Sequence, residues 1–327
     1  MANHFGHEIG PVAPDLPPRT APAGDRPALM FSGGLDSTAC SLFLPETAAL
    51  VFMDRIITPV DLPDPRSPVL VDLVQQRRLA LALRDAGRPM LFYRDNHEAL
   101  FSPYPSPHTA MTPLPLLYYA DALGITYQEI GAVLGNYYLE GYAAPDVAQW
   151  RYHPAHPNGP GGDGAGRHLA QLAVLGLRQG MTLSGMSEVA TACAVHRSPY
   201  RGQTYSCFQR SFHTHCLSCD KCFRKSLLEH VFADREVPAD LVSHFLAVPR
   251  VRQVFLQPYF GFHHVWFYIL QRVKCRHPFI RHLAAQAERY EDVGFLDKWY
   301  PAAAMGIPAP YRDAVVARIP AYLETMT

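Results

Sequence analysis

Residues 28–37 read Ala28-Leu29-Met30-Phe31-Ser32-Gly33-Gly34-Leu35-Asp36-Ser37. Four apolar residues are followed at once by a serine and two glycines, and then by residues compatible with a helix. This is the pattern of a buried strand that enters a helix through a tight turn. We therefore expect a strand at 28–31, a helix at 37–44 and an α/β fold.

The glycine-rich turn has the chemistry of a phosphate site. Backbone N–H groups at the start of a helix converge on one point, and the positive end of the helix dipole lies behind them. Gly33 and Gly34 let the backbone approach a ligand, while Ser32 and Ser37 add hydroxyl groups and Ser37 could also cap the helix. Asp36 would repel a triphosphate unless a cation lay between them, which predicts Mg²⁺. An ordinary strand-to-helix turn is the alternative.

Four cysteines far downstream have the spacing of a metal site. In the order Cys-x8-Cys-x2-Cys-x2-Cys they are Cys207, Cys216, Cys219 and Cys222. They can wrap one tetrahedral Zn²⁺ in a closed structural site, whereas the iron–sulfur run of bacterial ferredoxins needs a further cysteine followed by proline. His213 and His215 lie inside the loop and are reserve ligands. The chain starts without a secretory leader, so a reducing cytosol is expected and disulfides are the weaker alternative.

The turn is not a Walker A sequence, because no Gly-Lys-Ser/Thr follows, and it is not the dinucleotide fingerprint. Residues 32–37 resemble the SGGxDS loop of the PP-loop (N-type) ATP pyrophosphatase superfamily. The resemblance implies a Rossmann-like sheet of the adenine nucleotide alpha hydrolase type and transfer of AMP to a substrate oxygen with release of pyrophosphate. It implies that the loop, Leu35 included, holds the β- and γ-phosphates, with catalytic roles for Asp36 and Ser37.

Both motifs, with Thr204-Tyr205-Ser206 before the first cysteine, resemble the 7-cyano-7-deazaguanine synthase branch of that superfamily over about Ala28 to His230. Members activate a carboxylate with ATP, admit ammonia to form an amide, and activate again to reach a nitrile. The counterpart of the family's substrate stretch lies in residues 131–146. It implies substrate contacts for Asn136, Gly141, Tyr142 and Asp146. The Cys-Arg pair that follows in the family is missing here, so the acceptor stays open.

The remaining pattern alternates strands and helices. We expect strands at 48–53, 89–93, 129–134 and near 181–184, and helices at 70–86, 114–123 and 167–179. Together they predict a doubly wound, mainly parallel sheet, in which ligands bind beyond the carboxyl ends of the strands.

The end of the second strand is therefore expected beside the phosphate turn. Backbone groups of Phe52 and Met53 would read adenine there, although both side chains fit core packing equally well. Asp54 could meet the ribose or Mg²⁺, or cap a turn. The glycine-rich stretch 158–166 is either a surface connection or a lid, and as a lid it would bring Arg167 to the phosphates.

Composition sets the outer limits. The 327 residues include 48% apolar residues and equal numbers of basic and acidic side chains, 29 each, so a large core is expected without global attraction to nucleic acid. Six prolines in residues 1–27 predict a disordered leader. A PP-loop domain is expected at 28–230, with a zinc motif at 207–222, and a helical extension at 231–327.

These features predict a cytoplasmic, AMP-forming C–N ligase that uses ATP, Mg²⁺ and Zn²⁺. Its acceptor would be a small-molecule or peptide carboxylate, or an amide oxygen, and its nucleophile ammonia or an amine. A homodimer is allowed for, and neither a membrane nor a nucleic-acid partner is expected. One alternative is a sulfur-transfer enzyme acting on RNA, with Cys193 as the spare thiol. Another is a non-catalytic ATP-binding sensor or assembly subunit.

Basic residues crowd around the cysteine motif. They are Arg210, Lys221, Arg224 and Lys225. A solvated rim is the expectation for such residues, and contact with an anionic partner is the alternative.

Overall fold

The computed structural model describes residues 24–55, 74–95, 114–131, 133, 139–140, 151–152, 172–173, 175–205, 207, 215–256, 263–290 and 292–327. Its strands are β1 (Arg26–Met30), β2 (Ala49–Arg55), β3 (Met90–Asp95), β4 (Ile125–Glu129), β5 (Leu139–Glu140), β6 (Arg151–Tyr152) and β7 (Arg178–Gly180). Its α-helices are α2 (Leu35–Phe43), α3 (Val74–Asp85), α5 (Leu114–Leu123), α7 (Glu188–His196), α8 (Asp220–Phe232), α9 (Ala239–Ala247), α10 (Pro249–Leu256), α11 (His263–Leu270), α12 (Pro278–Ala287) and α13 (Ala309–Arg318). Short 3₁₀ helices are η5 (Gly294–Asp297), η6 (Pro301–Gly306) and η7 (Ile319–Ala321).

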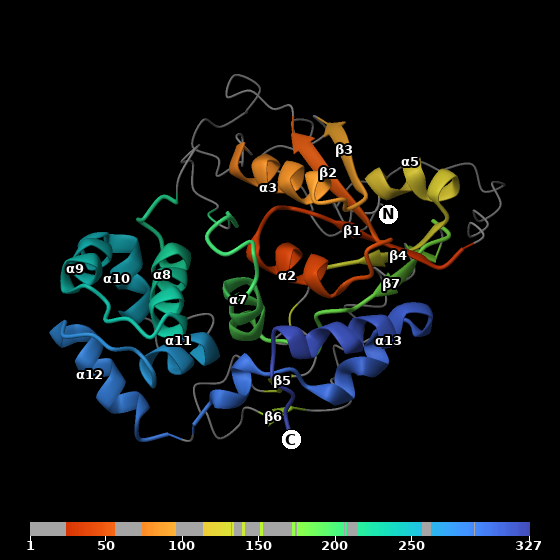
Figure 1. Cartoon of the computed structure of the whole chain (residues 1–327). Coiled ribbons are helices and arrows are strands. Elements are labelled where there is room, and N and C mark those ends of the chain that lie inside the picture. Colours follow the sequence, from red (N-terminus) through yellow and green to blue (C-terminus); the bar gives the residue numbers. More distant parts are fainter. Residues whose placement is uncertain are drawn as a thin grey trace, which may run out of the picture.

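The central sheet has five strands in the order β3-β2-β1-β4-β7, and every neighbouring pair is parallel. The chain first moves outward from β1 through β2 to β3 and then returns to place β4 on the other side of β1 (Figure 1). β5 and β6 form a separate antiparallel pair. The strand order therefore reverses between β1 and β4.

Both faces of this sheet are covered by helices. On one face, Leu29 and Phe31 share a core with residues of α2 and α3, and on the other Ala28 packs with Leu116 and Ala120 of α5. Burial on both faces explains why the strand β1 is a continuous apolar run rather than an alternating one. The expected α/β architecture with a parallel sheet is confirmed.

Two elements differ from the sequence-based expectation. The predicted strand at 129–134 is wrong, because β4 begins directly after Gly124, whose φ of +63° ends α5, and it stops at Glu129. The predicted helix at 167–179 is wrong at its C-terminal end, where residues 178–180 pair with β4 as β7. The strand near 181–184 is this same strand, displaced by a few residues. Gly176, with a φ of +67°, makes the sharp turn into it.

The C-terminal segment is helical and divides into two parts. The helices α8 to α12 gather at one side of the sheet around Phe223 and Trp266, whereas α13 lies against α2 (Figure 1). Tyr311 and Val315 of α13 belong to the same core as α2 and the sheet. Among the described helices, none has the length and apolar character needed to cross a membrane. Residues 299–323 thus complete the core of the sheet.

Candidate functional site

The turn between β1 and α2 is shaped by a glycine that no other residue can replace without strain. Gly33 has a φ of +69°, and a Cβ placed on it would lie 2.5 Å from Cβ and 2.7 Å from Cα of Gln76. Gln76 belongs to α3, so this helix packs directly on the turn. The second glycine, Gly34, is the N-cap of α2. It has no side chain that could accept a hydrogen bond from the amides of the first turn. The start of α2 is therefore left without a side-chain cap.

The two serines of the turn hold it closed. Ser32 Oγ and Ser37 Oγ are 3.0 Å apart, and Ser37 Oγ also donates to the Gly34 carbonyl at 3.1 Å. The backbone amides of Ser32 and Gly34 donate to these hydroxyls, each at 3.3 Å. Ser37 lies inside α2, so the suggestion that it caps the helix is wrong, since its hydroxyl reaches back to the loop instead.

The chain beyond β4 approaches the same helix start. A Cβ on Gly131 would lie 3.4 Å from the Ser37 amide nitrogen and 3.5 Å from Asp36 Cβ. Because β1 and β4 are parallel neighbours, their carboxyl ends meet at this edge, which is where the strand order reverses. Gly131 therefore lies against the first turn of α2.

One carboxylate oxygen of Asp36 is bonded to α7. Its Oδ1 accepts a hydrogen bond of 2.8 Å from Thr191 Oγ1. Burial raises the pKa of Asp36, with Glu188 adding to the rise, and Lys225 opposes it. The carboxylate therefore lies in a cluster of charged groups contributed by α7 and α8.

A buried ion pair links those two helices. Arg224 Nη2 donates to both carboxylate oxygens of Glu188, at 3.0 and 3.2 Å, and the Arg224 side chain is only 1% exposed. Burial alone would raise the pKa of Glu188, but Arg224 and Lys225 hold it below its usual value. Arg224 is thus a core residue, and the expectation of a solvated rim is wrong for it.

Two lysines on α8 face the same region. Lys221 and Lys225 are one turn apart, and both interact electrostatically with Asp36 and Glu188. Burial lowers the pKa of Lys225 to about 8, with the positive charge of Lys221 adding to the effect. Among the described residues, no hydrogen bond or ion pair reaches the Lys225 ammonium.

The four cysteines form one compact cluster at the start of α8. The sulfurs of Cys207, Cys216, Cys219 and Cys222 all lie within 4.8 Å of one another. Backbone amides donate to two of the sulfurs, from Ser218 to Cys216 and from Cys222 to Cys219, each at 3.4 Å. Such N–H···S bonds suit thiolate ligands, and the donor set fits a tetrahedral metal such as Zn²⁺. His215 stacks on Tyr205 at 5.0 Å and lies outside the sulfur cluster.

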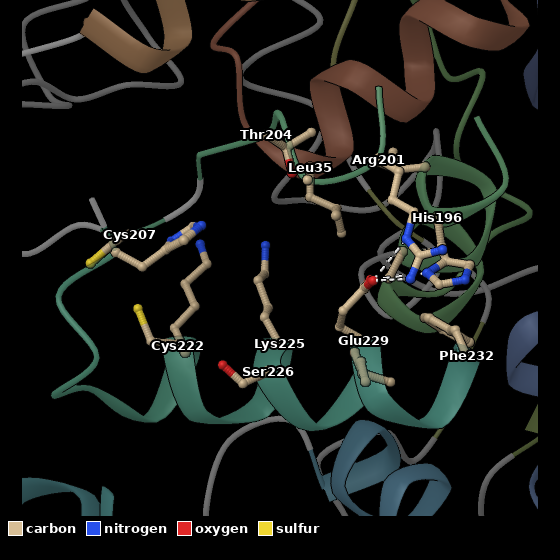
Figure 2. Close-up of a pocket in the computed structure, with 16 residues that line it drawn as sticks. Leu35, His196, Arg201, Thr204, Cys207, Cys222, Lys225, Ser226, Glu229 and Phe232 are labelled. Atoms are coloured by element: carbon tan, nitrogen blue, oxygen red, sulfur yellow. Dashed lines mark hydrogen bonds and ion pairs between the residues drawn. The ribbon is translucent and has the colours of Figure 1, made fainter. Parts of the chain in front are cut away.

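A cavity of about 260 Å³ lies between α2, α7 and α8, next to the cysteine cluster (Figure 2). Cys207 and Cys222 line one end, and Lys225 lies between Cys222 and Glu229 (Figure 2). His196, Arg201 and Glu229 line the other end. Glu229 accepts from Arg201 Nε at 2.9 Å and lies 2.9 Å from His196 Nδ1. The cavity therefore contains a lysine between the cysteine cluster and the Glu229–Arg201 ion pair.

A buried carboxyl group at the end of β4 links the C-terminal helix α13 to the sheet. Glu129, the last residue of β4, accepts from the Tyr311 hydroxyl at 2.6 Å and from the Thr182 amide at 3.0 Å. Burial raises the pKa of Glu129 to about 7. Gly180 permits this arrangement, since a Cβ there would collide with the Glu129 carboxylate.

The end of β2 lies beside β1, as its parallel pairing requires. Phe52 is buried and packs edge-on against Phe92 at 5.8 Å, Met53 is half-buried, and both backbones remain candidates for adenine recognition. Asp54 pairs with Arg77 at 3.7 Å and Arg94 at 3.5 Å, so its carboxylate joins α3 to β3.

Several predicted site residues lie outside the described residues. They are Asn136, Gly141, Tyr142, Asp146, Arg167 and the reserve ligand His213. The residues beside Asp36 that the sequence did not single out are Glu188 and Thr191. Only tertiary packing brings them to the site. That Lys221 and Lys225 point to the same side could have been predicted, because lysines four residues apart share one helix face.

The C-terminal half of the chain, residues 167–327, matches the model of a family of unknown function (DUF6395). The matched segment contains the cysteine cluster, α7, α8 and α13, whereas the loop between β1 and α2 lies before it. No curated protein matches the chain, and no solved structure matches it. The similarity therefore extends over the cysteine cluster and names no activity.

Proposed function

We propose that this chain is an AMP-forming ATP pyrophosphatase of the PP-loop type, which adenylates a carboxylate or an amide oxygen and then forms an amide or nitrile with ammonia or an amine. The observation that carries this proposal is the uncapped start of α2, set in a serine-tied glycine loop where the strand order of a parallel sheet reverses. Backbone amides at such a position favour phosphate oxygens, and the helix dipole adds to the attraction.

In the proposed reaction the protein acts by positioning and electrostatics. Amides of the loop hold the β- and γ-phosphates of ATP while one carboxylate oxygen of the acceptor attacks the α-phosphorus. The bond between the α-phosphorus and the bridging oxygen breaks, giving an acyl adenylate and pyrophosphate. The nitrogen lone pair of ammonia or an amine then attacks the acyl carbon, AMP leaves, and a proton is released. Mg²⁺, when held at Asp36, would neutralise charge on the departing pyrophosphate.

The cysteine cluster has a structural role in this proposal. Zn²⁺ bound by four thiolates leaves no open coordination position for a substrate. It would instead fix the start of α8 and with it the lysines that face Asp36. The doubly wound description of the sheet belongs to the same proposal, since helices cover both faces around the reversal point.

The sulfur-transfer alternative is disfavoured by the surroundings of Cys193. This thiol is 3% exposed, lies in the core between α7 and the sheet, and has a pKa raised to about 11 by burial. A persulfide carrier needs an accessible, easily ionised thiol, so Cys193 is unsuited to that role.

Isotope exchange between pyrophosphate and ATP tests the proposal. Purified zinc-loaded protein with Mg²⁺ and pools of small carboxylic acids is expected to catalyse the exchange and to release AMP. Asp36→Asn should lower the exchange by about 100-fold through the lost carboxylate charge, whereas Asp85→Asn on the exposed end of α3 should leave it unchanged. Formation of ADP would overturn the proposal. Nucleotide binding without pyrophosphate release would indicate the sensor alternative.

A further inference from the structure

The cavity between α2, α7 and α8 adjoins the phosphate loop without being part of it. Of residues 32–37, only Leu35 lines the cavity, while the serine and glycine positions face elsewhere. The Tyr205 amide donates to the Gly33 carbonyl at 3.1 Å, which joins the loop to the chain segment that leads to Cys207. A ligand in this cavity would therefore lie beside the triphosphate and would not replace it.

The apolar side chains that line the cavity favour a small apolar ligand. Leu35 covers it from α2, Val195 and Ala192 from α7, and Leu228 and Phe232 from α8. A volume of about 260 Å³ holds a compact molecule, and His196 and the Glu229–Arg201 ion pair line the same cavity. Apolar walls of this kind bind by excluding water from a ligand of matching shape.

Lys225, in the middle of the cavity (Figure 2), would select a negative charge. Lys225 extends from α8 into the cavity toward Leu35 (Figure 2), and no described residue forms a hydrogen bond or ion pair with its ammonium group. Its position near the start of α8 is unfavourable for a cation, because the helix dipole is positive there and Lys221 lies one turn away. Arg224 does not compete for a ligand, since it is bonded to Glu188. Asp36 and Glu188 offset part of this positive charge, and a bound anion would pair with the Lys225 ammonium directly.

We propose that this cavity is the acceptor subsite and that the acceptor is a compact, mostly apolar carboxylic acid whose carboxylate pairs with Lys225 beside Asp36. This inference rests on the proposed function, because it places the carboxylate next to the loop at which ATP would be held. It narrows the acceptor from any carboxylate, peptides included, to a small molecule that the cavity can enclose.

Binding measured without ATP tests the subsite separately from the chemistry. Saturation-transfer NMR with the full zinc-loaded chain would compare benzoate and cyclohexanecarboxylate with their neutral primary amides. The acids are expected to bind at least about tenfold more tightly than the amides, as a charge-assisted hydrogen bond requires. Lys225→Met should remove this preference, Lys225→Arg should retain most of it, and Lys298→Met, a lysine outside the cavity lining, should leave it unchanged.

A second variant tests the cavity without altering its charge. Ser226 lines the cavity on the helix α8, and Ser226→Leu is expected to fill the space and to weaken binding of acids and amides alike by about tenfold or more. Zinc content and thermal unfolding would establish that each variant is folded. Equal binding of acids and amides, no binding of either acid, or unchanged binding in both Lys225→Met and Ser226→Leu would overturn the inference. Failure of pyrophosphate exchange alone would overturn only the proposed chemistry.

Discussion

Two helix starts converge on the site, and they are built in opposite ways. The helix α2 begins at Gly34, which provides no side-chain bond to its first amides, whereas α8 begins at Cys219, whose sulfur accepts the Cys222 amide. The first turn of α2 carries an acid, Asp36, and the first two turns of α8 carry three basic residues. One helix thus offers main-chain donors and the other offers side-chain cations.

In the proposed anion site, α2 contributes main-chain amides and α8 contributes lysine side chains. An uncapped helix start binds a phosphate through geometry and dipole, without side chains that could move. At the start of α8 the Cys222 amide is already bonded to the Cys219 sulfur, and the lysines that follow supply the positive charge. In the proposed site, the cysteine cluster and the glycine loop are therefore complementary parts.

The largest expected effect comes from removing the metal at the start of α8. Chelation of the zinc-loaded protein, or Cys219→Ser, should lower the free energy of unfolding by more than about 5 kcal/mol, because structural zinc contributes folding energy directly. Cys275→Ser is the matched control, since this cysteine lies outside the cluster. Zinc analysis combined with thermal unfolding measures the effect. An unchanged melting temperature after complete loss of metal would contradict the structural role.

The next effect comes from breaking the buried pair that holds α8 against α7. Arg224→Met should cost about 3–5 kcal/mol in urea unfolding, because Glu188 is left buried without its partner. Adding Glu188→Gln should recover part of the loss. Arg276→Met, in the exposed pair with Glu236, should change stability by less than about 0.5 kcal/mol. Equal effects of the two arginine substitutions would show that the pair is unimportant.

The third effect is a pH dependence of the free energy of unfolding that arises from Glu129. The pKa of Glu129 is about 7 in the folded protein and 4.5 without burial, so the folded state binds more protons between these values. Stability should therefore fall as the pH rises from 4.5 to 7, by about 3 kcal/mol in total. Glu129→Gln should flatten this part of the profile in urea unfolding at a series of pH values. The interpretation fails if wild type and variant lose the same amount.

The smallest expected effect is the loss of stability when a positive-φ glycine is replaced by alanine, compared between Gly33 and Gly87. Gly33→Ala should cost about 2–3 kcal/mol, from its positive φ and its collision with Gln76. Gly87→Ala, at a φ of +88° with open space around it, should cost only about 1 kcal/mol. Calorimetry with ATP should show weaker binding for Gly33→Ala alone. Equal costs would mean that the packing of α3 on the loop contributes nothing.

The sequence predicted the elements that depend on local pattern. The helix at 114–123 has the bounds that its sequence indicated, and the strand entering the glycine turn lies within two residues of its expected position. The errors at 129–134 and 167–179 arose where apolar residues fit either a strand or a helix and a positive-φ glycine set the boundary. The cysteine cluster was also predictable, because two CxxC turns bring their sulfurs together locally.

The sequence did not predict which distant segments contact one another. Spacing indicated the glycine loop and the four cysteines, because each depends on residues close in the chain. Only the folded chain brings α7 and α8 to Asp36, turns Arg224 into a core residue and encloses the cavity beside Lys225. The physical reason is that the burial of a charge, and therefore its pKa and its partners, depends on packing between segments more than 150 residues apart, as with Thr191 and Asp36, whose separation is 155 residues.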